Sequence, residues 1–427
     1  MKRSKRAARI RPGGEVAAIH LETKPKERLV KLAKDLFEEV TLLRGRPQPI
    51  DPLLKFDTEA EKLPLPPEVR EMAYSMLGDR PFFAFAYAWL RQRIEGETFE
   101  ERQQLSALSS FSDTGAAAAA LVSDLLALPR TYVLSLPLPQ AFADMAKESD
   151  LPAAIGSTCA IVGTWHKEAE HYPAAVGLAP KSSFQWVKSA NIGLTSKASI
   201  FLHVQLGGFL SEFWPTRTND RMLSIVKSLL GLCIATGVFE VKSSLANSEH
   251  QFALNEKRPS QWNAVDTESL PEADGRLFDR LRVGPLPRED LPSVLQSVVD
   301  SFDGAPHLDH VRLGSKWLFA GFAANDPTMS FMHFAIVAEV VLGVGKRDKE
   351  MGITSLLSNR CAYLLGRDIR EREALLSEFE DLYQLRSQIV HYGLDEMNRQ
   401  KHAKLRRFRE LACMMLAAEL RASPNRK

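Results

Sequence analysis

The chain has 427 residues, which is enough for two or three domains with hydrophobic cores of their own. Its composition, 45% hydrophobic and 25% charged, is typical of a globular protein and excludes a fibrous or wholly disordered chain. The net charge of only +2 excludes binding to nucleic acid or membranes through overall charge, so any such binding must come from a local patch.

The first residues are basic, with six Lys and Arg side chains among residues 2–11. No apolar segment follows them, so they do not form a secretory signal. We expect residues 1–25 to be a flexible basic tail; the sharper alternative is a transient contact with the phosphates of a nucleic acid.

No apolar run reaches the length of a transmembrane helix, and the longest candidate, residues 116–128, contains Asp124 and ends at Pro129. The four cysteines are far apart and form no C-x-x-C pair, which is typical of reduced thiols rather than disulfides or zinc ligands. We therefore expect a cytoplasmic protein that has no membrane partner and needs no metal or cofactor.

Residues 26–290 combine helical and strand patterns. Apolar spacing predicts helices over residues 26–40, 82–94, 113–128 and 222–234, and strands over residues 131–136, 200–206, 238–241 and 251–254. Two proline-containing stretches, residues 47–67 and 255–290, are expected to be loops or irregular connectors. This part of the chain is predicted to be a mixed α/β region.

From about residue 291 onward the pattern is wholly helical, which predicts an all-α domain over residues 300–427 and an α+β fold class for the chain. Asp326-Pro327 is a helix start, because an N-cap residue precedes proline at the first helical position. Four helices are predicted here, over residues 327–343, 354–365, 370–391 and 396–420.

Two charges stand on stripes that should face the core. Arg386 lies three and four residues from Tyr383 and Leu382 on the apolar face of its helix. Glu339 interrupts a helix that is otherwise apolar nearly all round, so it should also be buried. Because a buried charge is costly without a partner, Arg386 and Glu339 are candidates to pair; an unrelated structural partner for Glu339 is the alternative.

His391 comes five residues after Arg386, where Gly393 can end the helix. The last predicted helix carries a basic run in its first half, which includes Lys401, Lys404, Arg406 and Arg407. A solvated helix face explains most runs of this kind. Beside Arg386 and His391, these four side chains are candidates to bind the phosphate backbone of RNA.

Three segments together resemble a known family. They are Ala335-Ile336-Val337-Ala338-Glu339, then the run from Ser358 to Gly366 (SNRCAYLLG), and the run from Tyr383 to Gly393 (YQLRSQIVHYG). The chain from about residue 310 to 420 is similar to the Apea-like branch of the HEPN superfamily. An R-x-x-x-x-H motif alone is weak, but this combination at this separation is fairly specific.

The resemblance implies a helical bundle that dimerises, so that two R-x-x-x-x-H motifs share one cleft. Many proteins of this superfamily are metal-independent endoribonucleases that act as toxins, in antiviral defence or in stress responses. By position, Arg386 and His391 become the catalytic pair and Glu339 a supporting residue. Ser387 takes the place of the polar residue that often follows the arginine, but it lacks the amide or carboxylate found there in many of these nucleases.

These residue types suit RNA cleavage. The 2′-hydroxyl of RNA is a built-in nucleophile, a histidine can exchange a proton near neutral pH, and an arginine can hold the scissile phosphate. On a regular helix, however, five positions separate two side chains by roughly 140°. A second chain, the length of the arginine or fraying of the helix must close that gap.

Other motifs are weaker. Gly343-Val344-Gly345-Lys346 fails as a phosphate loop because it lacks the first glycine and follows a helix. The cluster of His166, Glu168, Glu170 and His171 lacks the H-E-x-x-H spacing, and we interpret it as surface, as we do His307, Asp309 and His310.

Two hypotheses follow. In the first, the chain is a HEPN endoribonuclease in which residues 26–290 sense a trigger molecule or restrain the activity. In the second, the C-terminal domain is a non-catalytic module for dimerisation or for binding RNA or nucleotides. Because both Arg386 and His391 are present, the first is favoured.

Overall fold

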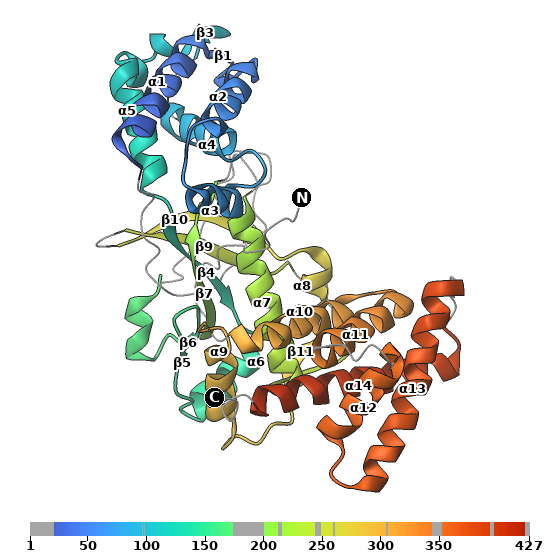
Figure 1. Cartoon of the computed structure of the whole chain (residues 1–427). Coiled ribbons are helices and arrows are strands. Elements are labelled where there is room, and N and C mark those ends of the chain that lie inside the picture. The colour runs from blue at the N-terminus through green and yellow to red at the C-terminus, as the bar shows by residue number, and fades with distance from the viewer. Residues whose placement is uncertain are drawn as a thin grey trace. The chain divides into compact units, whose positions relative to one another are not determined.

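The computed structural model describes residues 21–95, 97, 99–173, 200–211, 216–243, 249–258, 261–304, 306–343, 352–392 and 397–422 (Figure 1). Helices and sheets are both present, which confirms the α+β class. The chain divides into two compact units: residues 1–132, 205–222 and 255–266 form the first, and residues 133–204, 223–254 and 267–427 form the second. The first predicted helix begins at Thr23, slightly inside the stretch expected to be a tail.

The first unit is mainly helical. Its elements are α1 (Thr23–Glu39), β1 (Thr41–Leu43), β2 (Arg46–Pro47), α2 (Asp51–Glu61), α3 (Pro67–Leu77), α4 (Pro81–Ile94), β3 (Arg102–Gln104) and α5 (Thr114–Leu126). The expectation of a loop over residues 47–67 was wrong, because α2 occupies most of it. Pro52 lies at the start of α2 and Pro67 at the start of α3, where a missing N–H costs nothing.

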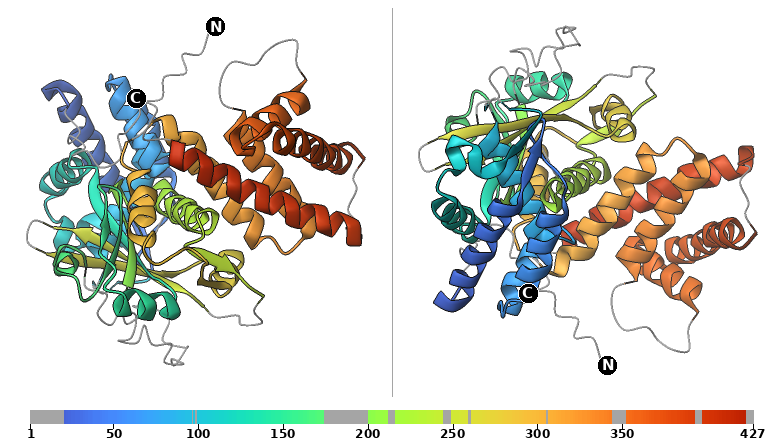
Figure 2. Two further views of the ribbon diagram at one scale, coloured as in Figure 1. Left: turned by 90° about the horizontal axis from the view of Figure 1, so that it is seen from below. Right: turned by 90° about the horizontal axis from the view of Figure 1, so that it is seen from above.

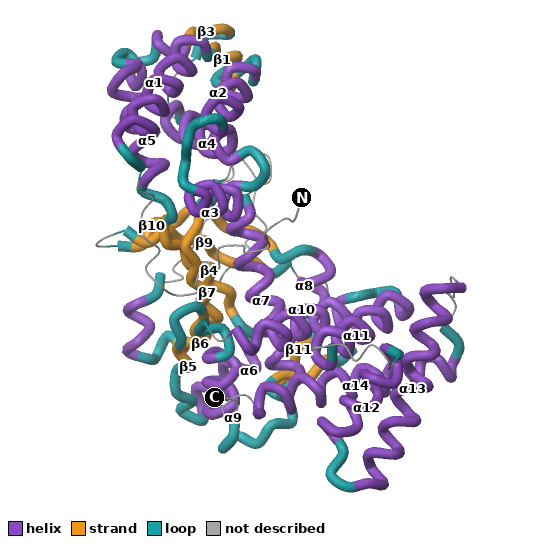
Figure 3. The backbone as a smooth tube through the Cα atoms, in the orientation of Figure 1, coloured by secondary structure: helices purple, strands orange, loops and turns teal. Residues whose placement is uncertain are grey.

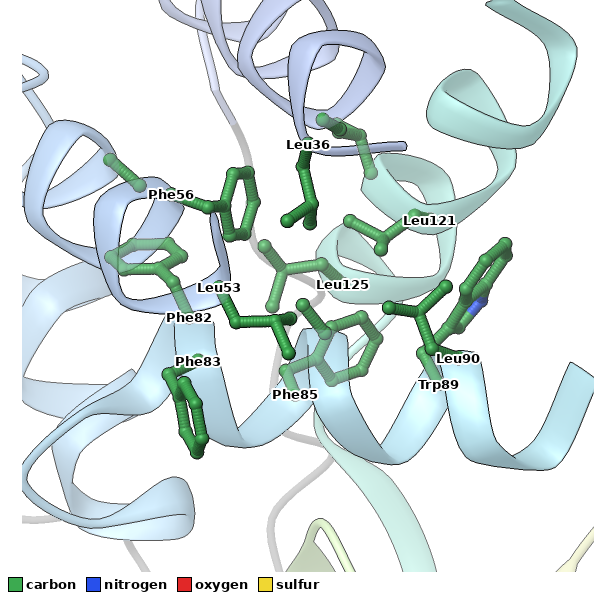
Figure 4. Close-up of a cluster of buried hydrophobic side chains, with 14 of the residues drawn as sticks. Leu36, Leu53, Phe56, Phe82, Phe83, Phe85, Trp89, Leu90, Leu121 and Leu125 are labelled. Atoms are coloured by element: carbon green, nitrogen blue, oxygen red, sulfur yellow. The ribbon is translucent and has the colours of Figure 1, made fainter. Parts of the chain in front are cut away.

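A cluster of apolar side chains forms the core of this unit (Figure 4). Leucine and aromatic side chains from α1, α2, α4 and α5 converge there, and helix α4 buries nearly its whole length. The rings of Phe37 and Trp89 stack at 5.8 Å, and the edge of Phe111 meets Phe37 at 5.4 Å. Asp57 on α2 is also buried, and its carboxylate accepts a hydrogen bond of 3.0 Å from the backbone N–H of Phe83 in the first turn of α4.

The largest sheet has six strands in the order β10-β9-β4-β7-β6-β5, and Figure 3 shows its strands in orange. They are β4 (Arg130–Pro137), β5 (Ala154–Ile155), β6 (Cys159–Gly163), β7 (Ile200–Gly208), β9 (Gln251–Lys257) and β10 (Trp262–Ser269). Strands β6 and β7 are antiparallel, with Cys159 opposite Val204. The four predicted strands are all confirmed, including β8 (Phe239–Val241), which pairs with β11 (Leu281–Val283) in a separate ribbon.

The expectation that residues 255–290 form an irregular connector was wrong. Strand β9 reaches Lys257, and β10, α8 (Glu272–Phe278) and β11 follow it. Most side chains of β10 are half-buried, without alternation between a buried and an exposed face. Its sequence therefore lacks the alternation of apolar and polar residues by which a strand is recognised. Proline precedes α8 just as it marks the starts of α2 and α3.

A histidine lies inside the sheet. The His203 side chain is buried in β7, its Nδ1 is 2.9 Å from the Ser135 Oγ on β4, and its ring stacks on Tyr172 at 4.4 Å. Burial lowers the pKa of His203 to about 3, because the charged imidazolium would lose its hydration there. His203 is therefore neutral in the folded protein throughout the neutral and mildly acidic range.

This histidine should make the protein acid-sensitive. Between pH 6.5 and about 3 the unfolded chain binds a proton at residue 203 that the folded chain does not, so the free energy of unfolding falls as the pH falls. Urea unfolding of the wild type and of His203→Gln across pH 4.5–7 should show a shallower pH dependence for the variant, by up to about 1.4 kcal/mol per pH unit. If the free energy of unfolding depended on pH equally in both proteins, the buried neutral His203 would not be the cause of the acid sensitivity.

The C-terminal helices belong to the second unit. They are α9 (Leu291–Asp300), α10 (Asp309–Ala323), α11 (Pro327–Leu342), α12 (Ile353–Leu365), α13 (Ile369–Tyr392) and α14 (Arg399–Ala422). Together with α6 (Gln140–Glu148) and α7 (Arg217–Ala235) they account for the remaining helices of the described ranges. The four predicted C-terminal helices are thus confirmed to within about three residues at each end. The two compact units are not divided at the predicted boundary between residues 290 and 300, and a separate all-α domain over residues 300–427 stays a prediction.

Helix α11 is enclosed by α10, α12, α13 and α14, and both views of Figure 2 show α14, in red, running alongside α10 and α11. The Asp326 side chain accepts a hydrogen bond of 2.7 Å from the Met329 N–H, so the predicted N-cap is confirmed. This enclosure explains why α11 is apolar on nearly every side. Among the described residues, no helix is long and apolar enough to cross a membrane.

Helices α7 and α10 approach each other closely at Gly231. A Cβ at this position would lie 2.1 Å from the Ser315 backbone oxygen, and Ser315 is fully buried. Gly231→Ala should therefore lower the free energy of unfolding by about 3 kcal/mol, although alanine is the better helix former. Gly115→Ala in α5 is the control, because its Cβ would meet only the Asp113 carboxylate at 3.3 Å. Equal denaturation midpoints for both variants would contradict the close approach.

Candidate functional site

The candidate site lies where α11 and α13 pack together. Leu382, Leu385 and Ile389 are buried and fix the inner face of α13. Arg386 follows on the flank of this face and keeps 25% of its side chain exposed, while Glu339 on α11 keeps 29%. Both charges are half-buried, between the core and the solvent.

Arg386 and Glu339 form an ion pair, as predicted: the distance from Arg386 Nη2 to Glu339 Oε1 is 3.0 Å. The hydroxyl of Tyr383, which is itself buried, donates a hydrogen bond of 2.7 Å to the same carboxylate oxygen. The Arg386 guanidinium carbon also lies 5.6 Å from the centroid of the Tyr383 ring. Glu339 therefore ties together two side chains that are one turn apart on α13.

Tyr383 is a member of the site that the motif alone does not reveal. Burial, and the hydrogen bond to Glu339, raise the pKa of its phenol well above the ordinary value, so it remains a hydrogen-bond donor at physiological pH. Its position three residues before the arginine, on the same helix face, was the available signal. A tyrosine on an apolar stripe, however, equally suits a plain core position.

One nitrogen of Arg386 is unused. Its Nε is buried and has no hydrogen-bond partner among the residues that the structure describes. A buried donor without a partner is costly, and a guanidinium matches the oxygens of a phosphate. Arg386 is thus held in place by Glu339 while keeping hydrogen-bonding capacity.

His391 lies in the last turn of α13 and is exposed. Residues five apart on a helix are separated by about 7.5 Å along the axis and by roughly 140° around it. Nothing in the described structure pairs His391 with Arg386. Ser387 is half-buried beside Arg386 in sequence. Gly393, the expected end of the helix, and residues 344–346 of the rejected phosphate loop lie outside the described residues.

Two of the four predicted RNA contacts are occupied by carboxylates of α13. Lys404 Nζ lies 2.7 Å from Asp381 Oδ1, and Arg407 forms a two-pronged ion pair with Glu378 through contacts of 2.8 and 3.0 Å. This pairing raises the pKa of Arg407 still further. Arg406 is exposed, and Lys401 is half-buried with interactions of its own. The RNA-binding role of the four stays a prediction, but Lys404 and Arg407 already serve to join α13 to α14.

The weaker histidine clusters are structural. His166 Nδ1 accepts a hydrogen bond of 3.1 Å from the Gly163 N–H, and its Nε2 lies 2.8 Å from the Leu151 carbonyl oxygen. His310 pairs with Glu419 at 3.3 Å. No group of three or more histidine, cysteine or acidic side chains that could hold a metal ion occurs within the described ranges.

Comparison with known proteins identifies no relative: no family model matches the chain, no curated protein matches it, and no solved structure matches it. The resemblance to the HEPN superfamily therefore stays a prediction, which depends on the motifs and on the geometry around Arg386.

The Glu339 contacts can be tested by their contribution to stability. Glu339→Ala leaves the half-buried Arg386 charge and the Tyr383 hydroxyl without their acceptor, and we expect a loss of about 2 kcal/mol in the free energy of unfolding. Tyr383→Phe should cost about 1 kcal/mol. Glu410→Ala is the control, because it removes only an exposed contact with Arg407 and should cost less than about 0.5 kcal/mol. If chemical denaturation gave Glu339→Ala and Glu410→Ala the same loss in free energy of unfolding, the Glu339 carboxylate would not be the acceptor shared by Arg386 and Tyr383.

Proposed function

We propose that the chain is a metal-independent endoribonuclease of the HEPN type, with Arg386 and His391 as its catalytic residues. The observation that carries this proposal is the Arg386–Glu339 ion pair, which holds a half-buried guanidinium on the same helix whose last turn carries the exposed His391.

Cleavage begins with the 2′-hydroxyl of RNA. His391 takes the proton from this hydroxyl, and the 2′-oxygen forms a bond to the adjacent phosphorus. Arg386 binds the phosphate oxygens and stabilises the negative charge that grows on them. The bond from phosphorus to the 5′-oxygen then breaks, which leaves a 2′,3′-cyclic phosphate on one fragment and a 5′-hydroxyl on the other.

The leaving 5′-oxygen needs a proton from a second acid. Because residues 386 and 391 point in directions roughly 140° apart, one α13 helix is poorly placed to supply a base, an acid and a phosphate ligand together. We propose a homodimer through the C-terminal helices, in which His391 of the partner subunit donates this proton. Glu339 and Tyr383 would orient Arg386 in each protomer.

The remaining part of the chain would then regulate this activity. The first unit has its own aromatic core and carries no part of the candidate site, which suits a region that senses a trigger molecule and keeps the nuclease silent until then. A nuclease under such control suits a toxin or a defence and stress-response protein of the cytoplasm.

Cleavage of total RNA by the purified full-length protein in EDTA tests the proposal. We expect the wild type to release fragments with 2′,3′-cyclic phosphate and 5′-hydroxyl ends, and His391→Ala and Arg386→Ala to lose at least about 100-fold in rate. His307→Ala, which removes an exposed histidine outside the site, is the matched control and should keep its rate. Equal cleavage by all four proteins would contradict the assignment.

Expression in a bacterial host is a complementary measurement for a wild type that is silent in vitro. Growth arrest with degradation of cellular RNA, abolished by Arg386→Ala, is expected. RNA binding without cleavage, unchanged in His391→Ala, would instead favour the non-catalytic binding module.

A further inference from the structure

Helix α14 has two basic faces with different surroundings. Lys404 and Arg407 lie on the face toward α13, where Asp381 and Glu378 neutralise them. Their positive charge is therefore largely used within the protein. A solvent polyanion would have to displace these carboxylates to reach them.

Arg406 and Arg409 lie one turn apart on the other face, at the spacing that brings side chains together on a helix surface. Arg406 is exposed and Arg409 is half-buried. The Arg409 guanidinium carbon stacks over the ring of Phe322 in α10, 5.4 Å from its centroid. Stacking orients the flat guanidinium but leaves its edges able to donate hydrogen bonds.

Arg280, between α8 and β11, reaches the same Phe322 from a distant part of the second unit. Its Nη1 donates to the Phe322 carbonyl oxygen at 3.3 Å, and its Nε donates to the Lys242 carbonyl oxygen at 3.2 Å. Burial, and then the nearby positive charge of Arg409, lower the pKa of Arg280. Two guanidiniums thus converge on one phenylalanine.

Within the described ranges, neither Arg280 nor Arg409 forms an ion pair with an acidic side chain, in contrast to Arg407 two residues before Arg409. A structural role explains the position of Arg280 in part, because its hydrogen bond to the Phe322 carbonyl oxygen caps the carboxyl end of α10. It does not explain Arg409, whose charge repels Arg280 and adds nothing to that cap.

We propose that Arg280, Arg406 and Arg409 form a binding surface for the phosphodiester backbone of RNA. An anionic phosphate offsets the repulsion between Arg280 and Arg409, and each guanidinium can still donate to its oxygens. In place of Lys404 and Arg407, this RNA-binding surface uses three arginines for which no acidic partner occurs among the residues that the structure describes. It rests on the proposed nuclease function, since RNA is the substrate that such an enzyme must hold.

Salt-dependent RNA binding tests this surface. The probe is a fluorescein-labelled single-stranded oligouridylate of twelve nucleotides, and the full-length protein carries His391→Ala so that binding is measured without cleavage. Adding Arg409→Ala should weaken binding about fivefold at 0.1 M salt, and should reduce the slope of log K against log salt by about 0.7, the value for one lost phosphate contact. Arg406→Ala should behave in the same way.

Lys404→Ala distinguishes this surface from the RNA contacts predicted from the sequence, because it removes one positive charge from the same helix but a charge that Asp381 already balances. Its affinity and salt slope should stay close to the parent values. Arg280→Ala could unfold the end of α10, so Arg280→Lys is measured beside it; the lysine should retain most of the salt slope.

Equal effects of Arg409→Ala and Lys404→Ala would overturn the proposal, because binding would then follow only the net charge. An unchanged salt slope in Arg409→Ala would also overturn it, as would displacement of the RNA by an equal charge concentration of polyglutamate. If the wild type cleaves RNA while Arg409→Ala binds and cleaves normally, this surface fails and the nuclease stands. If Arg409 governs binding but the wild type neither cleaves RNA in vitro nor arrests growth on expression, the nuclease fails and the surface stands.

Discussion

The carboxylate of Glu339 is the interaction on which the candidate site depends. Helix α11 is enclosed by four other helices and is apolar on nearly every side, so its one acidic side chain must find partners at the edge of that core. It finds Arg386 and Tyr383, both on α13. This pairing joins α13 to α11 at the edge of the core, beside the apolar contacts of Leu382, Leu385 and Ile389. The same contact that makes a charged residue tolerable inside the bundle therefore positions the proposed chemistry.

The arginines of α14 differ in whether a carboxylate pairs with them, and this difference distinguishes those that hold the fold from those able to bind an anion. Arg407 has two carboxylate partners and serves to join α13 to α14, whereas Arg409, two residues further on, stacks on Phe322 and faces another guanidinium. A helix turns by about 200° over two residues, so neighbours in the sequence meet opposite surroundings. The basic run of α14 thus forms two surfaces, and within the described ranges one of them is paired with carboxylates while the other is not.

The outline of the fold could be predicted where one face of an element is clearly apolar. The four C-terminal helices and the predicted strands follow from such periodicity, and the Asp326 cap follows from its sequence alone. The prediction failed where proline was interpreted as a loop signal, since Pro52 and Pro67 instead begin helices, and where β10 lacks alternation. Short elements without an amphipathic pattern depend on neighbours that are distant in the chain.

For the candidate site, helical periodicity in the sequence was enough to place Arg386 on a core-facing stripe and to make Glu339 a candidate partner, because both follow from the position of a charge within a helical period. The packing of the helices was needed to show that Tyr383 shares the same carboxylate oxygen, that Lys404 and Arg407 pair with acidic residues of α13, and that Arg280 lies near Arg409. Helical periodicity says which face a residue occupies but not which side chain lies opposite. That second fact is settled by the packing of segments more than a hundred residues apart, such as those that carry Arg280 and Arg409.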